Sequence, residues 1–225
     1  MYLIRALRRL RRLRRDEKGL AMLEFALSLP VVLPLGLYAI ELSNYALVQM
    51  RLSQIALTLA DNASRVGVTT SLNVQELREF DINEVFQGVR LQGSSLNIAQ
   101  RGRITLSSLE VNAQGGQWIR WQRCLGLKSG TDWDSSYGRE GDGATGTSLT
   151  GMGPTGSTVT APPGAAVMFV ELNYEYQPLI TEFFLGTPNT RFIASFIVRD
   201  NRDLAKGITN PAPTETPMLC SNYTT

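Results

Sequence analysis

Residues 20–40 read LAMLEFALSLPVVLPLGLYAI, a run of 21 positions that contains a single charged residue, Glu24. At about 1.5 Å per residue, a helix of this length measures about 30 Å, which is enough to cross the hydrocarbon core of a bilayer. Pro30 and Pro34 are tolerated in such a helix and should bend it rather than end it. A buried core helix fits less well, because helices in globular proteins seldom stay apolar on all sides for this length. The run therefore predicts a transmembrane helix.

The leader before this run, residues 1–19, is strongly basic. It contains eight of the 22 basic residues and only two of the 20 acidic ones, a net charge of +6, and the rest of the chain carries a net charge of −4. The positive-inside rule therefore places the N-terminus in the cytoplasm and the residues after about 40 in the periplasm. A secretory signal peptide is the alternative, but the apolar run is long for one and no small-x-small cleavage site follows it. The overall charge of +2 is the sum of a basic leader and an acidic remainder, so it indicates no nucleic-acid partner.

Apolar residues continue beyond the predicted span at steps of three and four. This spacing predicts that the helix extends through residues 41–66 with one apolar face, and that Gly67 ends it. The positions that form this stripe are Leu42, Tyr45, Val48, Leu52, Ile55, Leu59, Ala63 and Val66. A helical stripe of this kind needs a surface to pack against, which the later part of the chain must supply.

Residues 67–206 predict a periplasmic domain built mainly from strands. Residues 74–88 indicate one or two short helical turns closed by Gly88, whereas 103–111 and 117–126 predict a hairpin. Residues 165–179 and the segment around Phe192–Val198 alternate apolar and polar positions, which is typical of strands with one buried face. We therefore expect an α+β fold in which the long N-terminal transmembrane and amphipathic helix packs on an antiparallel sheet of about four strands, the general plan of a pilin.

Two further segments are expected to lack regular structure. Residues 129–164 are rich in Gly, Ser and Thr and predict a long solvated loop. Its carboxylates Asp132, Asp134 and Asp142 do not have the spacing of an EF-hand, so we expect no metal there. Residues 207–225 form a tail rich in Pro and Thr.

The chain contains no histidine and two cysteines, Cys124 and Cys220. Without histidine it lacks the commonest general base and metal ligand, and the residues suggest no nucleophile with an activating partner. We therefore expect neither an enzyme nor a cofactor. In an oxidising compartment one long-range disulfide is the natural pairing of the cysteines, and two separate buried thiols are the alternative.

The boundary between leader and apolar run resembles the type III/IV prepilin signal. In that signal a membrane-embedded prepilin peptidase cuts after a glycine, here between Gly19 and Leu20, and the fifth residue of the mature chain is glutamate, here Glu24. Cleavage would create an ammonium group on Leu20 one helical turn from the Glu24 carboxylate, so the two charges could pair within one subunit or between neighbours. The alternative is that Glu24 reaches toward the headgroups from an uncleaved anchor.

More closely, GLAMLEFALSLPVVLPLGLYAIEL followed by QMRLSQIALTLADNASRVG resembles the TadE-like family, the minor pilins or pseudopilins of the tight-adherence (Tad/Flp) system. The resemblance implies a subunit that takes part in pilus priming, assembly or tip adhesion. It implies as partners a prepilin peptidase, other pilins and inner-membrane platform proteins. Pilins often join their C-terminal region by a disulfide, which agrees with the two cysteines. An uncleaved inner-membrane scaffold of the same machine is the alternative, and in either case the chain is a single-pass protein of the inner membrane.

Overall fold

A computed structural model of the protein describes residues 18–71 and 73–224. Most of the predicted leader, residues 1–17, lies outside this range. Contacts divide the chain into two units: the first comprises Met1–Asn44 with Pro178–Gly186, and the second comprises Tyr45–Gln177 with Thr187–Thr225. One helix, α2 (Lys18–Arg65), contributes to both units, and its bounds agree with the helix predicted from residue 20 to residue 66. Pro30 and Pro34 lie inside α2, so they do not end it.

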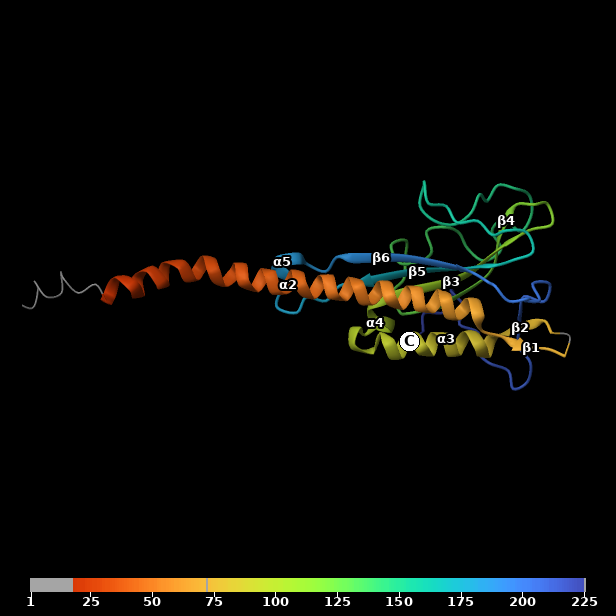
Figure 1. Cartoon of the computed structure of the whole chain (residues 1–225), viewed down its shortest axis with the longest axis horizontal. Coiled ribbons are helices and arrows are strands. Elements are labelled where there is room, and N and C mark those ends of the chain that lie inside the picture. Colours follow the sequence, from red (N-terminus) through yellow and green to blue (C-terminus); the bar gives the residue numbers. More distant parts are fainter. Residues whose placement is uncertain (1–17, 72, 225) are drawn as a thin grey trace, which may run out of the picture. The chain divides into compact units, whose positions relative to one another are not determined.

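The first unit combines the apolar half of α2 with a loop from the distant part of the chain. This loop, Pro178–Gly186, contains the single helical turn α5 (Glu182–Leu185). The Thr181 side chain caps α5 by accepting a hydrogen bond from the backbone nitrogen of Phe183 at 3.2 Å. Figure 1 shows α5 alongside α2.

The second unit is built on a four-stranded sheet in which all neighbours are antiparallel, in the order β4-β3-β5-β6. Its strands are β3 (Gly102–Val111), β4 (Gln117–Leu125), β5 (Val167–Glu175) and β6 (Asn189–Ile197). The predicted hairpin is present as β3 and β4, where the Asn112 side chain accepts hydrogen bonds from the backbone of Gln114 and Gly116. The expected α+β fold, with a long apolar helix followed by an antiparallel sheet of four strands, is confirmed.

One face of the sheet lies on the side of the helices. Along β5 and just beyond it, alternate residues on this face are buried: Met168, Val170, Leu172, Tyr174 and Tyr176. Most of the predicted stripe on α2 is buried as well, notably at Leu52, Leu59 and Ala63, whereas its first position, Leu42, is exposed. The ring of Tyr45 meets the ring of Tyr176 edge-on at 4.8 Å, so α2 and the sheet face share this contact. Burying these apolar side chains is the main stabilising contribution to the unit.

The segment predicted as short helical turns at 74–88 is helical only from Glu79 onward. Gln75–Arg78 form strand β2, which pairs with β1 (Val68–Thr69) and with β7 (Ile208–Thr209) from the tail. Helix α3 (Glu79–Gln92) then passes through Gly88 and ends at Gly93, whose N–H donates to the Val89 carbonyl at 2.8 Å. The predicted stop at Gly88 was wrong because that residue faces open space and nothing there interrupts the helix. Figure 1 shows α3 running alongside the end of α2.

Two short elements return the chain from α3 to the sheet. The 3-10 helix η1 (Ser94–Leu96) is followed by the single turn α4 (Ile98–Arg101), with Asn97 between them in the left-handed conformation at φ 49°. Asparagine tolerates this conformation better than most residues. The carbonyl of Leu96 accepts a hydrogen bond of 2.9 Å from the buried Tyr174 hydroxyl, which fixes this turn to β5.

The long Gly-rich loop contains no helix or strand and most of its residues are exposed, as predicted, but part of it packs on the opposite face of the sheet, which the sequence did not predict. Met152 and Ala161 of the loop are buried with Leu109, Ile119 and Phe169 of the strands, and further apolar side chains pack around them: Val111, Tyr137, Leu149, Val159 and Val167. Part of this opposite face is therefore apolar as well, and the loop forms a second small core with it. Figure 1 shows this loop in green to cyan beside β4.

The end of α2 is fixed by a backbone feature and by a distant side chain. Gly67 has φ 149°, and a Cβ there would lie 3.1 Å from the Glu76 carbonyl oxygen, so a larger residue would be strained. The Arg202 guanidinium donates to the carbonyls of Ala63 and Val66 at 3.2 and 2.7 Å. These carbonyls have no partner within the helix, and a cation is favourable at a helix C-terminus. Burial lowers the pKa of Arg202.

Candidate functional site

The predicted processing site lies at the start of α2. Gly19 and Leu20 are in its first turn and are exposed, as is Glu24 four residues later. A Cβ added at Gly19 would meet no described atom within 4 Å, so within the described part of the chain packing does not require glycine here. Any demand for glycine must therefore come from a partner or from the unwinding that it permits.

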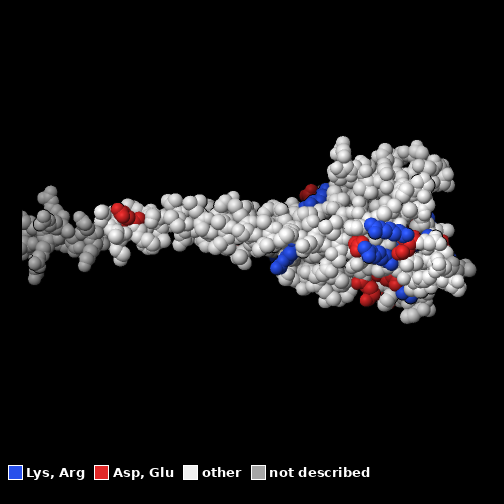
Figure 2. Space-filling view, viewed as in Figure 1, with Lys and Arg blue, Asp and Glu red and all other residues white. Residues whose placement is uncertain are grey.

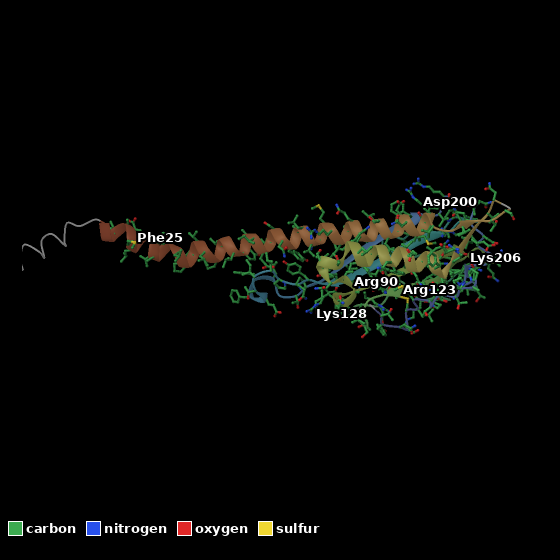
Figure 3. The ribbon with its side chains drawn as sticks, turned by 90° about the horizontal axis from the view of Figure 1, so that it is seen from below. Phe25, Arg90, Arg123, Lys128, Asp200 and Lys206 are labelled. Carbon is green, nitrogen blue, oxygen red and sulfur yellow. A yellow bond between two sulfur atoms is a disulfide. The ribbon has the colours of Figure 1, made fainter. Side chains whose placement is uncertain are left out.

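The span itself has the surface of a lipid-facing helix. Among the described residues, one helix is long and apolar enough to cross a membrane; its best window has a mean hydropathy of 2.0 and none of that window is buried. A core helix of a soluble protein would be mostly buried, so this exposure argues against that interpretation. Figure 2 shows the corresponding surface as almost entirely uncharged, and Phe25, labelled in Figure 3, is one of its exposed side chains.

Glu24 is isolated in this apolar surface. Within residues 18–71 and 73–224 it takes part in no ion pair, so a charged partner would have to come from the leader, a new N-terminus or another chain. A lone carboxylate inside a membrane is costly and usually functional. Its position four residues after Leu20 in a continuous helix places it about 6 Å along the axis from that residue.

Glu41 ends the span, and the sequence does not reveal its role. Its side chain is fully buried, and the two carboxylate oxygens accept hydrogen bonds from the backbone nitrogens of Leu179 and Ile180 at 3.0 and 2.9 Å. One turn earlier, the ring of Tyr38 lies 5.7 Å from the ring of Phe184. These contacts fix the loop Pro178–Gly186 to α2. No local pattern could predict them, because they join positions far apart in the sequence.

Cys124 and Cys220 are joined by a disulfide, with their Cα atoms 4.7 Å apart and 96 positions apart in sequence. The tail follows the outer edge of β4: the Cys124 nitrogen donates to the Met218 carbonyl and the Gly126 nitrogen donates to the Thr224 carbonyl, at 2.7 and 2.8 Å. An open sheet edge can pair with another chain, and the tail covers this edge.

Arg103 on β3 is the main contact for the end of the tail. Its buried guanidinium donates to the carbonyls of Gly126 and Cys220 and lies 4.4 Å from the centre of the Tyr223 ring. Burial lowers its pKa, and the nearby Asp134 acts in the opposite direction. An arginine in a strand is usually predicted to be exposed, so the sequence alone does not show this role.

A second buried charge joins α3 to the sheet. Arg123 on β4, labelled in Figure 3, pairs with Glu79 at the start of α3 and with Glu140 of the Gly-rich loop, at 3.2 Å in the latter case. Two hydrogen bonds join Arg123 to Glu79, and both side chains are buried. This pair positions α3 and the loop against β4.

The acidic residues of the Gly-rich loop have structural partners. Asp142 accepts a 2.7 Å hydrogen bond from the backbone nitrogen of Arg139, and Asp134 lies 3.7 Å from Arg103. The Asp132 carbonyl accepts from Asn189 at 3.0 Å. The described part of the chain contains no group of three or more His, Cys, Asp or Glu side chains that could hold a metal ion.

The candidate residues thus fall into two groups. Gly19, Leu20 and Glu24 share the first unit, and the disulfide lies in the second. Only the first group lies in a segment that matches a known protein family. Residues 19–67 match the family of TadE-like proteins.

This match confirms the resemblance seen in the sequence and indicates a protein related to the Tad pilus. The matched TadE-like segment begins at Gly19 and ends at Gly67, two residues beyond the end of α2, so the similarity lies in this helix. The sheet and the Gly-rich loop lie outside it. No curated protein and no solved structure matches the chain.

Proposed function

We propose that the protein is a minor pilin, or pseudopilin, of a Tad/Flp-type pilus, cut by a prepilin peptidase between Gly19 and Leu20. It would be inserted in the inner membrane with its N-terminus in the cytoplasm and its sheet domain in the periplasm, and then enter the pilus to prime assembly or contact surfaces. The match to TadE-like proteins over residues 19–67 supports the Tad system. The one observation that carries the finer assignment is Glu24, an exposed carboxylate on the apolar face of α2, one helical turn from Leu20.

The proposed role of cleavage is electrostatic. Removing the leader takes away a net charge of +6, which holds the N-terminus in the cytoplasm. Cleavage also creates an ammonium group on Leu20. In a filament, this group and a Glu24 carboxylate would be buried together, and each would offset the desolvation cost of the other. The partners in this account are the peptidase, the other pilins and the platform proteins of the inner membrane.

Two variants test this function in cells that assemble the pilus. Gly19→Arg should leave insertion intact but block processing, so the protein should keep its leader and stay in the membrane. Glu24→Ala should be inserted and cleaved but should be absent from sheared filaments, because the ammonium group has lost its partner. Normal maturation of Gly19→Arg, or normal recovery of Glu24→Ala in filaments, would refute the corresponding part of the proposal.

A second candidate is an uncleaved periplasmic scaffold of the same machine. The observation that favours it is that α2 already includes Lys18, Gly19 and Leu20, so the bond between Gly19 and Leu20 lies in helical backbone rather than in an extended substrate segment. In that case functional complexes would retain residues 1–19.

A further inference from the structure

The loop Pro178–Gly186 exposes large apolar side chains to a degree that is unusual for a surface loop. Phe183 is 87% exposed, Leu179 is 64% exposed and Ile180 is also exposed. The loop contains one charged residue, Glu182. Clustered apolar side chains at a surface mark a site for a protein or membrane partner.

The loop is fixed at one height on α2. Glu41 binds the backbone nitrogens of Leu179 and Ile180, and Tyr38 packs against Phe184. Phe184 in turn meets the ring of Phe183 edge-on at 5.7 Å. All of these residues belong to the first unit, so the position of the loop along α2 follows from contacts within that unit.

This height corresponds to the outer boundary of the bilayer. A helix that enters the membrane at Leu20 has risen about 30 Å by Ile40, which is the thickness of the hydrocarbon core. Tyr38 therefore lies at the level where amphipathic rings concentrate in membrane proteins. Phe184 contacts both Tyr38 and Phe183, so Phe183 lies close to the same level of the bilayer.

The polar groups of the loop suit a site of low polarity. Glu41 is buried, and its two oxygens meet two backbone N–H groups, so the carboxylate and these donors satisfy each other. The backbone nitrogens of Phe183 and Gly186 donate to Thr181 and to Glu182 within the loop. Backbone groups must find such partners where water is scarce.

We propose that this loop inserts Leu179, Ile180 and Phe183 into the periplasmic headgroup region of the membrane that α2 crosses, as a second contact beside the helix. The proposal rests on the membrane-anchored state in the proposed function. Its occupant is the lipid surface, since the apolar patch continues directly from the lipid-facing part of α2. The loop would then fix the rotation of α2 about its axis, which a single span leaves free.

Position-specific fluorescence quenching tests the loop directly. Both native cysteines are in the disulfide, so a single added cysteine can carry an environment-sensitive dye. The full chain is reconstituted in phosphatidylcholine–phosphatidylglycerol vesicles containing lipids spin-labelled near the headgroup. Phe183→Cys should be quenched at least twofold more strongly by these lipids than Leu127→Cys, an exposed position in the second unit. Equal quenching at the two positions would overturn the proposal.

Two further measurements separate lipid from protein contact and the loop from the anchor. The emission spectrum of the dye at position 183, which reports whether water surrounds it, should be unchanged when the protein is diluted to one chain per vesicle. A shift to the spectrum of a water-exposed dye on dilution would mean that a second copy covers the loop, and would overturn the lipid assignment. A dye at Val31→Cys, measured with lipids spin-labelled deep in the acyl chains, reports the span, because this position lies near the middle of the predicted transmembrane segment. Quenching at position 31 without quenching at position 183 would overturn the loop proposal alone, whereas no quenching at either would overturn the anchor as well.

Discussion

The Glu41 carboxylate lies 2.9 Å from the backbone nitrogen of Ile180, a residue 139 positions further along the chain. Through this contact the end of the apolar helix holds the loop Pro178–Gly186, which follows strand β5. Glu41, the first residue after the apolar run, therefore has a structural role. It also gives a direct test of how the loop is held.

Replacing Glu41 with alanine should release the loop. The change removes two hydrogen bonds that the N–H groups of Leu179 and Ile180 donate to a charged acceptor, and each such bond contributes about 1.5–3 kcal/mol. Hydrogen exchange of these two amides, measured on the full chain in detergent micelles, should accelerate at least tenfold. Glu182→Gln, an exposed change in the same loop, is the matched control and should leave both rates unchanged. Equal rates in wild type and Glu41→Ala would show that the carboxylate does not hold the loop.

The disulfide should contribute through the unfolded state. A cross-link between residues 96 positions apart stabilises the folded chain by about 4–5 kcal/mol in the loop-entropy model. Cys124→Ser and Cys220→Ser should each lower the free energy of unfolding by a similar amount, and the double variant should lose little more than either single variant. Denaturant unfolding with and without reductant checks this. Additive losses in the double variant would contradict it.

The second core beneath the Gly-rich loop predicts a large effect at Met152. This side chain is 0% exposed and packs with Phe169 and Leu109. Met152→Ala should cost about 2–5 kcal/mol, because it removes buried contacts and leaves a cavity. Met50→Ala is the matched control: Met50 is 53% exposed, so the cost in the monomer should stay within about 0.5 kcal/mol. Similar unfolding free energies for the two variants would mean that Met152 does not anchor the loop to the sheet.

Glu171 predicts a specific pH dependence. Burial raises the pKa of this carboxyl, and hydrogen bonds from Ser135 and from the Ser136 backbone only partly oppose the rise. The folded protein therefore holds the Glu171 proton more tightly than the unfolded chain does. The contribution of this protonated carboxyl to the free energy of unfolding is complete below the ordinary pKa of 4.5 and is lost as the pH rises through the raised pKa. The difference in unfolding free energy between Glu171→Gln and wild type should therefore favour the variant more at pH 7 than at pH 4. Unfolding curves across this range should show the difference, and a difference independent of pH would contradict the assignment.

Local patterns predicted the elements whose stability depends on local periodicity. The apolar run and its amphipathic continuation gave α2 to within about two residues, and alternation gave the four strands of the sheet. Glu24 could be singled out because a charge in an apolar run is unusual at any position. Cys124 and Cys220 left a single intramolecular pairing available.

Features that depend on distant partners were not predicted. Gln75–Arg78 became a strand because β1 and β7 supply its hydrogen bonds, and Gly88 did not end α3 because no turn forms there. The Gly-rich loop has no strand or helix period, although Met152 and Ala161 pack on an apolar part of the opposite face of the sheet. Three charged residues are buried because distant groups pair with them. The Cys220 carbonyl accepts from Arg103, the Glu79 carboxylate pairs with Arg123, and the Ile180 N–H donates to Glu41.

The central claim concerns the pair formed by Leu20 and Glu24, and the mass of the mature chain tests it most directly. Intact mass spectrometry should be applied separately to membranes and to sheared filaments from cells that assemble the pilus. Filament protein is predicted to begin at Leu20, with residues 1–19 removed and an amine available to Glu24. A chain that begins at Met1 in both fractions would contradict processing and leave an ordinary membrane-tethered protein.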